Sequence, residues 1–251
     1  MSDRVLEITG LVKRFGGILA TDCIDLHVRA GELHAVIGPN GAGKTTLIAE
    51  IAGDVTADAG CIRFAGTDIT RLPAYRRVRL GLARSFQITS IFKNLSVLDN
   101  VALAVQAHSG HSFRFLRPAR SNPALRQPAR KCLEQVGLHT RADVQAGTLS
   151  HGEKRLLEIA IALAGQPRLL LLDEPMAGMG PEESARMIEL LASLKGKFAI
   201  LLVEHDMDAV FALADRITVL VYGCVIACGS PDAIRKDDAV RRAYLGEEAL
   251  A

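Results

Sequence analysis

The stretch "VIGPNGAGKTT", residues 36–46, contains residues whose types and spacing suit the binding of phosphate groups. Gly38, Gly43, Lys44 and Thr45 satisfy the pattern G-x-x-x-x-G-K-[ST]. Glycines allow successive backbone N–H groups to point inward around an anion at a helix N-terminus, where about half a positive charge also resides. Lys44 is then expected to reach the β- and γ-phosphates of a nucleotide, and the hydroxyl of Thr45 to bind Mg²⁺.

The surroundings of this loop agree with that chemistry. It follows the apolar residues 33–37, which predict a strand, and it precedes a stretch that predicts a helix. A glycine turn that is merely flexible explains neither the Lys-Thr pair nor the preceding strand. Contacts to the nucleotide are expected along the whole loop, at Gly38, Pro39, Asn40, Gly41, Ala42, Gly43, Lys44, Thr45 and Thr46.

A pair of carboxylates follows a second apolar run. In "RLLLLDEP", residues 168–175, four leucines predict a buried strand that ends in Asp173 and Glu174. Ligands of α/β proteins bind at the carboxyl ends of such strands. Asp173 is therefore expected to hold Mg²⁺, and Glu174 to polarise an attacking water. The alternative, a carboxylate pair that only caps a loop, is less favoured because the phosphate loop is present.

The segment "FAILLVEHD", residues 198–206, repeats this design. Its apolar run brings Glu204, His205 and Asp206 to the same predicted edge. A lone histidine is more often a packed or surface residue, but a histidine at the end of a strand favours a contact to the γ-phosphate. His205 is therefore expected to take part in catalysis.

Composition limits the classes of protein to which the chain can belong. With 251 residues, 49% of them hydrophobic, it can form one large domain or two small ones. Its 30 basic and 28 acidic side chains give a net charge of +2, so no overall field favours nucleic acid or an anionic membrane. The apolar runs at 169–172 and 198–203 are far shorter than the roughly 18 residues needed to cross a bilayer, so membrane association is expected to be peripheral.

Five cysteines are spread along the chain without a leader sequence, and we interpret them as reduced thiols of a cytoplasmic protein: Cys23, Cys61, Cys132, Cys224 and Cys228. The stretch "VLVYGCVIACG", residues 219–229, predicts a strand. Four residues of strand separate the sulfurs of Cys224 and Cys228 by roughly 13 Å, so one metal ion cannot bridge them. Strand thiols are therefore preferred to a zinc site.

Two kinds of sheet are predicted. "CIDLHV" (23–28) and "CIRFAG" (61–66) alternate apolar and polar residues, as half-buried antiparallel strands do. "LHAVIG", "LLLLD" and "FAILLV" are continuously apolar, as parallel strands covered on both faces are. Helices are expected after Gly43, at about 97–107, 125–137 and 152–165, and from Pro181, where Glu182 and Glu183 show the acidic bias of a helix start.

The segment 100–133 contains no acidic residue and several basic ones. We interpret about 107–131 as a basic insertion. A solvated excursion from the fold and a contact with a partner protein or with lipid phosphates are both open interpretations. Its basic residues are Arg114, Arg117, Arg120, Arg126, Arg130 and Lys131.

From about residue 5 to 245 the sequence resembles the ATP-binding cassette (ABC) ATPases that power ABC transporters. "LSHGE", residues 149–153, stands where that family has its signature "LSGGQ", ahead of the "LLLLDEP" strand. The resemblance implies that Phe15 stacks on adenine. It also implies that Gln87, in "RSFQ", senses the metal and the attacking water and touches the membrane subunits.

In the family, the signature of one subunit closes over the ATP of another, so contacts in trans are implied for Ser150, His151, Gly152 and Glu153. His151 and Glu153 depart from the family's glycine and glutamine, and Gly180 stands in place of the usual aspartate of the D-loop. His151 could add a donor to the phosphate or crowd it. The D-loop contact is not carried over.

The resemblance implies an α/β P-loop NTPase with a mostly parallel core sheet, an antiparallel β subdomain and a helical signature subdomain. We expect a single ABC ATPase domain over 1–251, with the helical subdomain at 88–165 and a C-terminal helical tail at 230–251.

The basic insertion, "LSHGEKRLLEIAIALA", "DEPMAGMGPEES" and "AYLGEE" are similar to the ATPase subunit of branched-chain amino acid importers. This implies ATP and Mg²⁺ as cofactors and a second ABC ATPase subunit, the same chain or a related one, as partner. It further implies two permease subunits, indirect contact with an extracytoplasmic solute-binding protein and no nucleic acid. The expected location is the cytoplasmic face of the inner membrane, and the isolated subunit should be soluble.

Three other interpretations remain at this stage. The ATPase of a urea or other small-solute importer is a near relative of the preferred one. A non-transport ABC ATPase acting on ribosomes or DNA is less favoured, because the chain has neither a second cassette nor a long coiled coil. A GTPase or small-molecule kinase is disfavoured because the sequence lacks an [NT]-K-x-D motif and contains "LSHGE".

Overall fold

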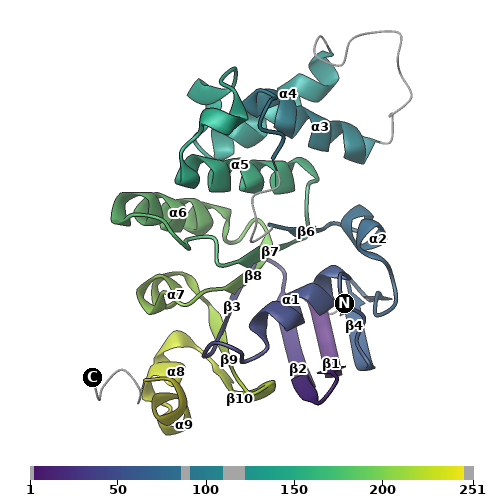
Figure 1. Cartoon of the computed structure of the whole chain (residues 1–251), viewed down its shortest axis with the longest axis vertical. Helices are drawn as coiled ribbons and strands as arrows, with labels where there is room; N and C mark the ends of the chain where they lie inside the picture. The colour runs from purple at the N-terminus through teal and green to yellow at the C-terminus, as the bar shows by residue number, and fades with distance from the viewer. Residues whose placement is uncertain (1–2, 86–90, 110–121, 246–251) are drawn as a thin grey trace. The chain divides into compact units, whose positions relative to one another are not determined.

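The computed structural model describes residues 3–85, 91–109 and 122–245. The chain divides into two compact units (Figure 1). The first comprises residues up to 82 together with 168–174 and the residues from 194 onward, and the second comprises 83–167 and 175–193. The second unit thus holds the predicted helical segment 88–165 and in addition residues 175–193, which the prediction did not include.

A four-stranded antiparallel sheet begins the first unit, in the order β2-β1-β4-β5. Its strands are β1 (Arg4–Phe15), β2 (Ile18–Arg29), β4 (Ala59–Phe64) and β5 (Thr67–Asp68). Ile24, Leu26 and Val28 of β2 are buried while Asp25 is exposed. The alternation in "CIDLHV" and "CIRFAG" therefore predicted antiparallel strands correctly.

A mostly parallel sheet has the order β10-β9-β3-β8-β7-β6. Its strands are β3 (Leu33–Ile37), β6 (Leu82–Arg84, where the chain passes from one unit to the other), β7 (Leu169–Asp173), β8 (Ala199–Val203), β9 (Arg216–Val221) and β10 (Cys224–Gly229). β3 pairs in parallel with β8 and β9, and β7 pairs in parallel with β8. Every residue of β3, β7 and β8 is buried, which confirms the prediction from their continuous apolar runs.

Residues 219–229 form parts of two strands where one was expected, and Cys224 and Cys228 both lie in the second of them, β10, as predicted. β9 and β10 are antiparallel and joined by the two-residue turn Tyr222–Gly223. Both turn residues have left-handed φ values, 48° and 81°. Tight hairpins favour Asn-Gly or Gly-Gly there. A tyrosine at the first turn position gave no such signal in the sequence.

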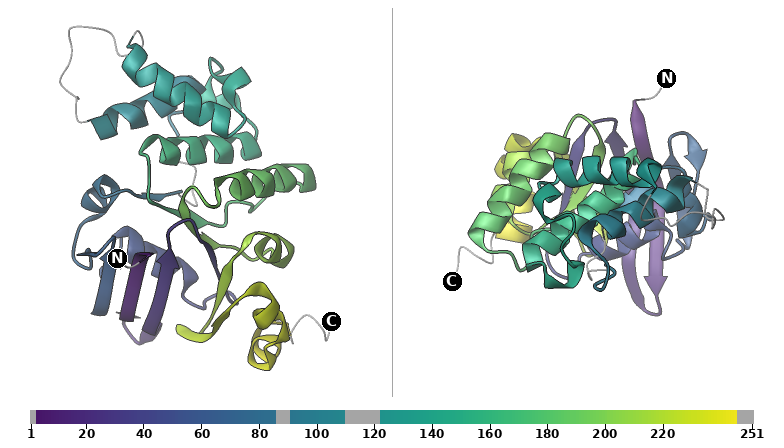
Figure 2. Two further views of the ribbon diagram at one scale, coloured as in Figure 1. Left: turned by 180° about the vertical axis from the view of Figure 1, so that it is seen from behind. Right: turned by 90° about the horizontal axis from the view of Figure 1, so that it is seen from above.

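Helix α1 (Lys44–Ala52) packs between the two sheets of the first unit. Its buried residues Leu47, Ile48 and Ile51 share one core cluster with β1 and β2 on one side and with β7 and β8 on the other. Figures 1 and 2 show α1 against the antiparallel sheet from opposite sides. Burial of each such aliphatic side chain stabilises the folded chain by about 1.5–3 kcal/mol. The core thereby fixes the helix that must present the phosphate loop.

Short helices complete the first unit. α2 (Ala74–Arg79) carries the buried Arg77, which donates to the carbonyl oxygens of Glu50 and Ile51 at the end of α1, at 2.6 and 2.8 Å. The C-terminal part contains α7 (Met207–Leu213), α8 (Pro231–Lys236), α9 (Asp238–Val240) and the π-helical η4 (Arg241–Leu245). Within the predicted tail, residues 246–251 lie outside the described residues.

The second unit is helical. It contains α3 (Val97–Ser109), α4 (Pro123–Gln135), α5 (His151–Ala164) and α6 (Pro181–Leu194, whose last residue belongs to the first unit), with the 3₁₀ turns η2 (His139–Arg141) and η3 (Ala146–Thr148). The predicted helices begin within two residues of the observed ones. About half of the basic insertion, residues 110–121 with Arg114, Arg117 and Arg120, lies outside the described residues.

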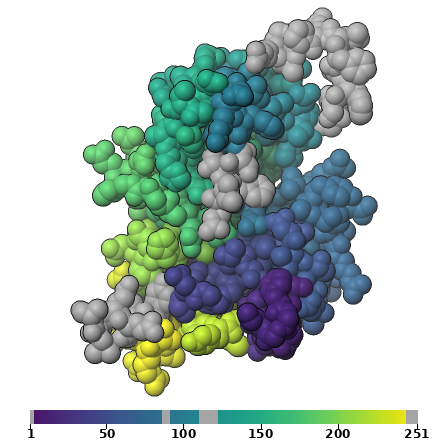
Figure 3. Space-filling view, in the orientation of Figure 1, coloured from purple at the N-terminus to yellow at the C-terminus, as the bar shows by residue number. Residues whose placement is uncertain are grey.

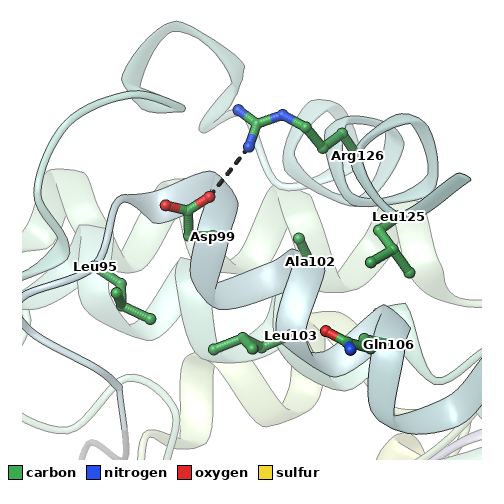
Figure 4. A pocket seen from close by; sticks show the side chains of 7 residues that line it. All are labelled: Leu95, Asp99, Ala102, Leu103, Gln106, Leu125 and Arg126. Carbon is green, nitrogen blue, oxygen red and sulfur yellow. Dashed lines mark hydrogen bonds and ion pairs between the residues drawn. The ribbon is translucent and has the colours of Figure 1, made fainter. Parts of the chain in front are cut away.

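Between α3 and α4 lies a mainly apolar pocket of about 190 Å³ (Figure 4). Arg126 of α4 spans its rim and donates to Asp99 of α3 at 3.1 Å. Leu103, on its floor, is 40% exposed. Its lining residues are Leu95, Asp99, Ala102, Leu103, Gln106, Leu125 and Arg126.

Candidate nucleotide-binding site

The loop between β3 and α1 depends on glycine for two separate reasons. Gly38, Gly41 and Gly43 have φ values of 155°, 79° and 100°, which side chains rarely adopt. A Cβ at Gly38 would also lie 2.1 Å from the carbonyl oxygen of Leu220, and one at Gly43 would lie 2.1 Å from that of Ala20. The backbones of strands β9 and β2 therefore lie against the loop, and only glycine fits at positions 38 and 43.

Lys44 closes this loop on itself. Its side chain is buried, and its Nζ donates to the carbonyl oxygens of Gly38 at 2.6 Å and Pro39 at 3.0 Å. Burial lowers the pKa of Lys44, and the charges of Glu174 and Asp173 oppose that shift. The structure thus brings the predicted lysine and the two predicted carboxylates within electrostatic reach of one another.

The carboxylate pair stands at the end of β7. Asp173 is the last residue of that strand, is 1% exposed and is paired with Val203 of β8. Glu174 follows with φ of 48°, and its N–H donates to the carbonyl oxygen of Val203 at 2.8 Å. A left-handed φ at a non-glycine residue costs on the order of 1–3 kcal/mol, and such strain gathers at functional sites.

Residues 204–206 have three different roles, although the sequence grouped them. Glu204 is fully buried, and its carboxylate accepts from the N–H of His205 at 3.0 Å. The side chain of His205 is 62% exposed, so its ring is accessible. Asp206 accepts from the N–H of Ala209 at 3.1 Å as the N-cap of α7, which gives it a structural role.

The oxygen donors at this edge fit magnesium. Mg²⁺ prefers hard oxygen ligands, and it is usually held by one or two carboxylates together with substrate phosphates. The hydroxyl of Thr45 and the carboxylate of Asp173 are oxygen donors of this kind. Among the described residues no group of three or more His, Cys, Asp or Glu forms a metal cage of its own. Gln87, the third predicted ligand, lies outside the described residues.

Phe15 is placed at the end of β1 by a tight turn. The turn Gly16–Gly17 joins Phe15 to its strand partner Ile18. Phe15 is 49% exposed and Ile18 is 71% exposed, and Figure 3 shows purple atoms of the N-terminal part of the chain at the surface. Lys13 Nζ lies 5.3 Å from the centre of the Phe15 ring. About half of the surface of Phe15 is therefore open to solvent.

The signature residues form the start of α5 in the second unit. Ser150 is the N-cap and accepts from the N–H of Glu153 at 3.1 Å, while the Glu153 carboxylate accepts from the N–H of Ser150 at 2.9 Å. This reciprocal pair is a capping box, which the sequence analysis missed although the spacing Ser-x-x-Glu signals it. Glu153 thereby stabilises the start of α5.

His151 and Gly152 are held by the chain that follows β7. His151 Nε2 lies 3.2 Å from the carbonyl oxygen of Ala177 and must carry the proton, because a carbonyl oxygen only accepts. A Cβ at Gly152 would lie 2.6 Å from the carboxylate of Glu183 on α6. Sequence reasoning interpreted Glu183 only as the acidic bias of a helix start. Its contact with the signature depends on tertiary structure.

Behind the phosphate loop lies a buried acid that the sequence analysis also missed. Glu50 of α1 is fully buried and accepts from the hydroxyl of Thr21 on β2 at 3.0 Å. Burial raises the pKa of Glu50 to about 7. The sequence shows it as one polar residue within an otherwise apolar helix face.

Comparison with known families agrees with this geometry. The sequence profile described as "ABC transporter" matches residues 21–177, more than half of the chain. The chain belongs to the ABC transporter family. A second profile, "Branched-chain amino acid ATP-binding cassette transporter", matches residues 224–249. As an ABC ATPase, the chain binds ATP and hydrolyses it. This confirms the predicted fold class and activity.

Individual relatives span nearly the whole ABC ATPase. It is 39% identical to the high-affinity branched-chain amino acid transport ATP-binding protein BraF of Pseudomonas aeruginosa, over 98% of this chain and 100% of that protein. It is 38% identical to LivG of Escherichia coli, which carries the same description, with the same coverage. The solved structure of an ATP-binding cassette in its ADP conformation matches with a TM-score of 0.86 and 30% identity, over 98% of this chain and all of that one.

Within the described residues, no helix combines the length and the apolar character needed to cross a membrane.

Proposed function

We propose that this ABC ATPase powers the uptake of branched-chain or other hydrophobic amino acids. The observation that carries the proposal is the similarity to BraF and LivG, which are branched-chain amino acid transport ATP-binding proteins, over 98% of the chain. The match of the second profile to residues 224–249 supports it, because that profile describes the branched-chain transporters.

The proposal assigns ATP to the glycine loop and its neighbours. The backbone of residues 38–46 cradles the phosphates, and Phe15 stacks on the adenine. In the structure Lys44 donates to two carbonyl oxygens of its own loop. On nucleotide binding those bonds are exchanged for bonds to phosphate oxygens, which are stronger because both partners are charged. Thr45 and Asp173 would hold Mg²⁺, with Gln87 as a further ligand, and the ion would neutralise charge on the β- and γ-phosphates.

Hydrolysis is assigned to the residues at the ends of β7 and β8. Glu174 accepts a proton from water as the water oxygen bonds to the γ-phosphorus, and the bond from that phosphorus to the bridging oxygen of ADP breaks. His205 contacts the γ-phosphate, since its exposed ring is anchored through the backbone to the buried Glu204. Positioning and charge neutralisation supply most of the acceleration in this class of reaction.

A second ATPase subunit completes each site. Ser150 and the Gly152 backbone, flanked by His151 and Glu153, would contact the γ-phosphate of ATP held by that subunit. Binding of two nucleotides between the subunits favours the closed dimer, and hydrolysis restores the open one. The proposed assembly contains this chain or a related ATPase as the second subunit, two permease subunits and, indirectly, an extracytoplasmic solute-binding protein. The ATPase lies at the cytoplasmic face of the inner membrane.

The test is to isolate the intact complex from membranes and reconstitute it in vesicles with its solute-binding protein. We expect leucine, isoleucine or valine to stimulate ATP hydrolysis and to accumulate inside, and we expect both effects to be lost with Lys44→Ala. Stimulation by urea but by no amino acid would reject the proposed substrate. Hydrolysis that responds to no solute would reject the coupling itself.

A further inference from the structure

The side chain of Glu183, which lies outside the family motifs, accepts a hydrogen bond from the signature serine, Ser150. The hydroxyl of Ser150 lies 3.1 Å from Oε1 of Glu183, which is on the first turn of α6 in the same compact unit. The Glu183 carboxylate also reaches the backbone of Gly152 so closely that a Cβ there would lie 2.6 Å from it. Glu183 therefore covers the two signature residues to which the proposed trans contact is assigned.

The hydrogen-bonding capacity of Ser150 makes this contact exclusive. A serine hydroxyl has one proton to donate and lone pairs with which to accept. Ser150 already accepts from the N–H of Glu153. Its single proton points to Glu183, because an ionised carboxylate can only accept. A phosphate oxygen can also only accept, so the same proton cannot serve Glu183 and a γ-phosphate at once.

Charge strengthens the competition. The N-terminus of a helix carries a partial positive charge that stabilises one anion placed against it, and two anions there repel each other. Glu183 presents its carboxylate at the start of α5, where the phosphate would arrive. Beside it is a cavity of about 320 Å³, so the side chain has room to move. The cavity is lined by Ser150, Gly152, Glu153, Leu156, Met179, Glu183, Arg186 and Met187.

We propose that Glu183 is an internal competitor of the γ-phosphate: it holds the Ser150 hydroxyl in the resting chain and must release it before the signature can close on the partner's ATP. This inference rests on the proposed function, because it assumes that ATP from the second subunit meets Ser150. It adds a residue that sets how much ATP is needed for closure. Arg186, one turn further along α6 and on the same cavity, is a cation that can receive the released carboxylate.

The experiment compares Glu183→Gln and Glu183→Ala with the wild type in the isolated transporter complex. The matched control is Glu182→Gln, which removes the same charge from the adjacent, exposed position. The measured quantities are the half-saturating ATP concentration of hydrolysis and the affinity for ADP. Removing the carboxylate should lower the half-saturating ATP concentration roughly two- to fivefold, the range expected for one charge at a helix terminus. ADP affinity should not change, because ADP has no γ-phosphate.

The outcomes separate the possible explanations. An unchanged or raised half-saturating ATP concentration in both Glu183 variants, with an active wild type, overturns the inference. An equal effect of Glu182→Gln also overturns it, because the cause is then general charge. A parallel change in ADP affinity indicates a structural role and rejects the competition. If the wild-type complex itself does not hydrolyse ATP, the proposed function fails instead.

Discussion

The buried Glu50 gives a prediction that can be worked through from the structure. Its pKa rises from the ordinary value of 4.5 to about 7, because burial disfavours the charged form. Between these two values the folded chain holds a proton that the unfolded chain releases. The free energy of unfolding therefore falls as the pH rises through this window, by about 1.4 kcal/mol for each pH unit.

Above pH 7 Glu50 is charged in the folded chain too, and the free energy of unfolding has lost the whole contribution of its proton. The difference of roughly 2.5 pH units corresponds to a loss of up to about 3 kcal/mol from this residue. Other charges contribute less: Lys13 favours the ionised form and Asp58 disfavours it. Glutamine has the same shape and stays neutral, and its amide oxygen can still accept from Thr21.

We therefore expect Glu50→Gln to stabilise the chain at pH 8.5 by about 2–3 kcal/mol and by less than about 1 kcal/mol at pH 5. For a chain of this size that corresponds to a rise in melting temperature of about 5–10 °C at pH 8.5. Thermal unfolding of both proteins across pH 5 to 8.5 measures it, with the exposed Glu182→Gln as the control for loss of one charge. A stabilisation that is equal at both ends of the pH range would refute the reasoning.

Three other substitutions test the site and the turn beside it. Glu174→Gln should keep ATP binding but lower turnover by about 100-fold or more, because the attacking water loses its base; near wild-type phosphate release would contradict that role. Lys44→Ala should weaken ATP binding by about tenfold or more, since charge-assisted bonds to phosphate are lost, and an unchanged affinity by calorimetry would contradict the phosphate-cradle assignment. Tyr222→Asn should stabilise the chain by about 0.5–1 kcal/mol, because asparagine tolerates the left-handed φ of 48° better than tyrosine; a lower melting temperature would argue against turn strain.

Most of the fold and the chemical centre could be predicted from the sequence, because the relevant signals are local. Continuous apolar runs identified β3, β7 and β8 as buried parallel strands, and each run ended next to the polar residues of the site. Since parallel strands share an edge for their carboxyl ends, Lys44 and Asp173 were expected to converge. In the structure the charge of Asp173 raises the pKa of Lys44, so the two side chains lie within electrostatic reach of each other.

Other features could not be predicted, because they depend on atoms distant in sequence. Position 43 must be glycine because the carbonyl oxygen of Ala20 approaches it, and Glu183 meets Ser150 across 33 positions of chain. The hairpin at Tyr222 has a turn residue without the usual turn chemistry.

The sequence by itself determined the phosphate loop, the strands that position it and the acids beside it, because periodicity and spacing along the chain encode them. Only the tertiary structure decided which carboxylate is buried with a raised pKa, as at Glu50, and which one accepts the hydrogen bond of the signature serine, as at Glu183. The physical reason is that desolvation and competition for a single proton depend on neighbours in space, which a one-dimensional pattern does not specify.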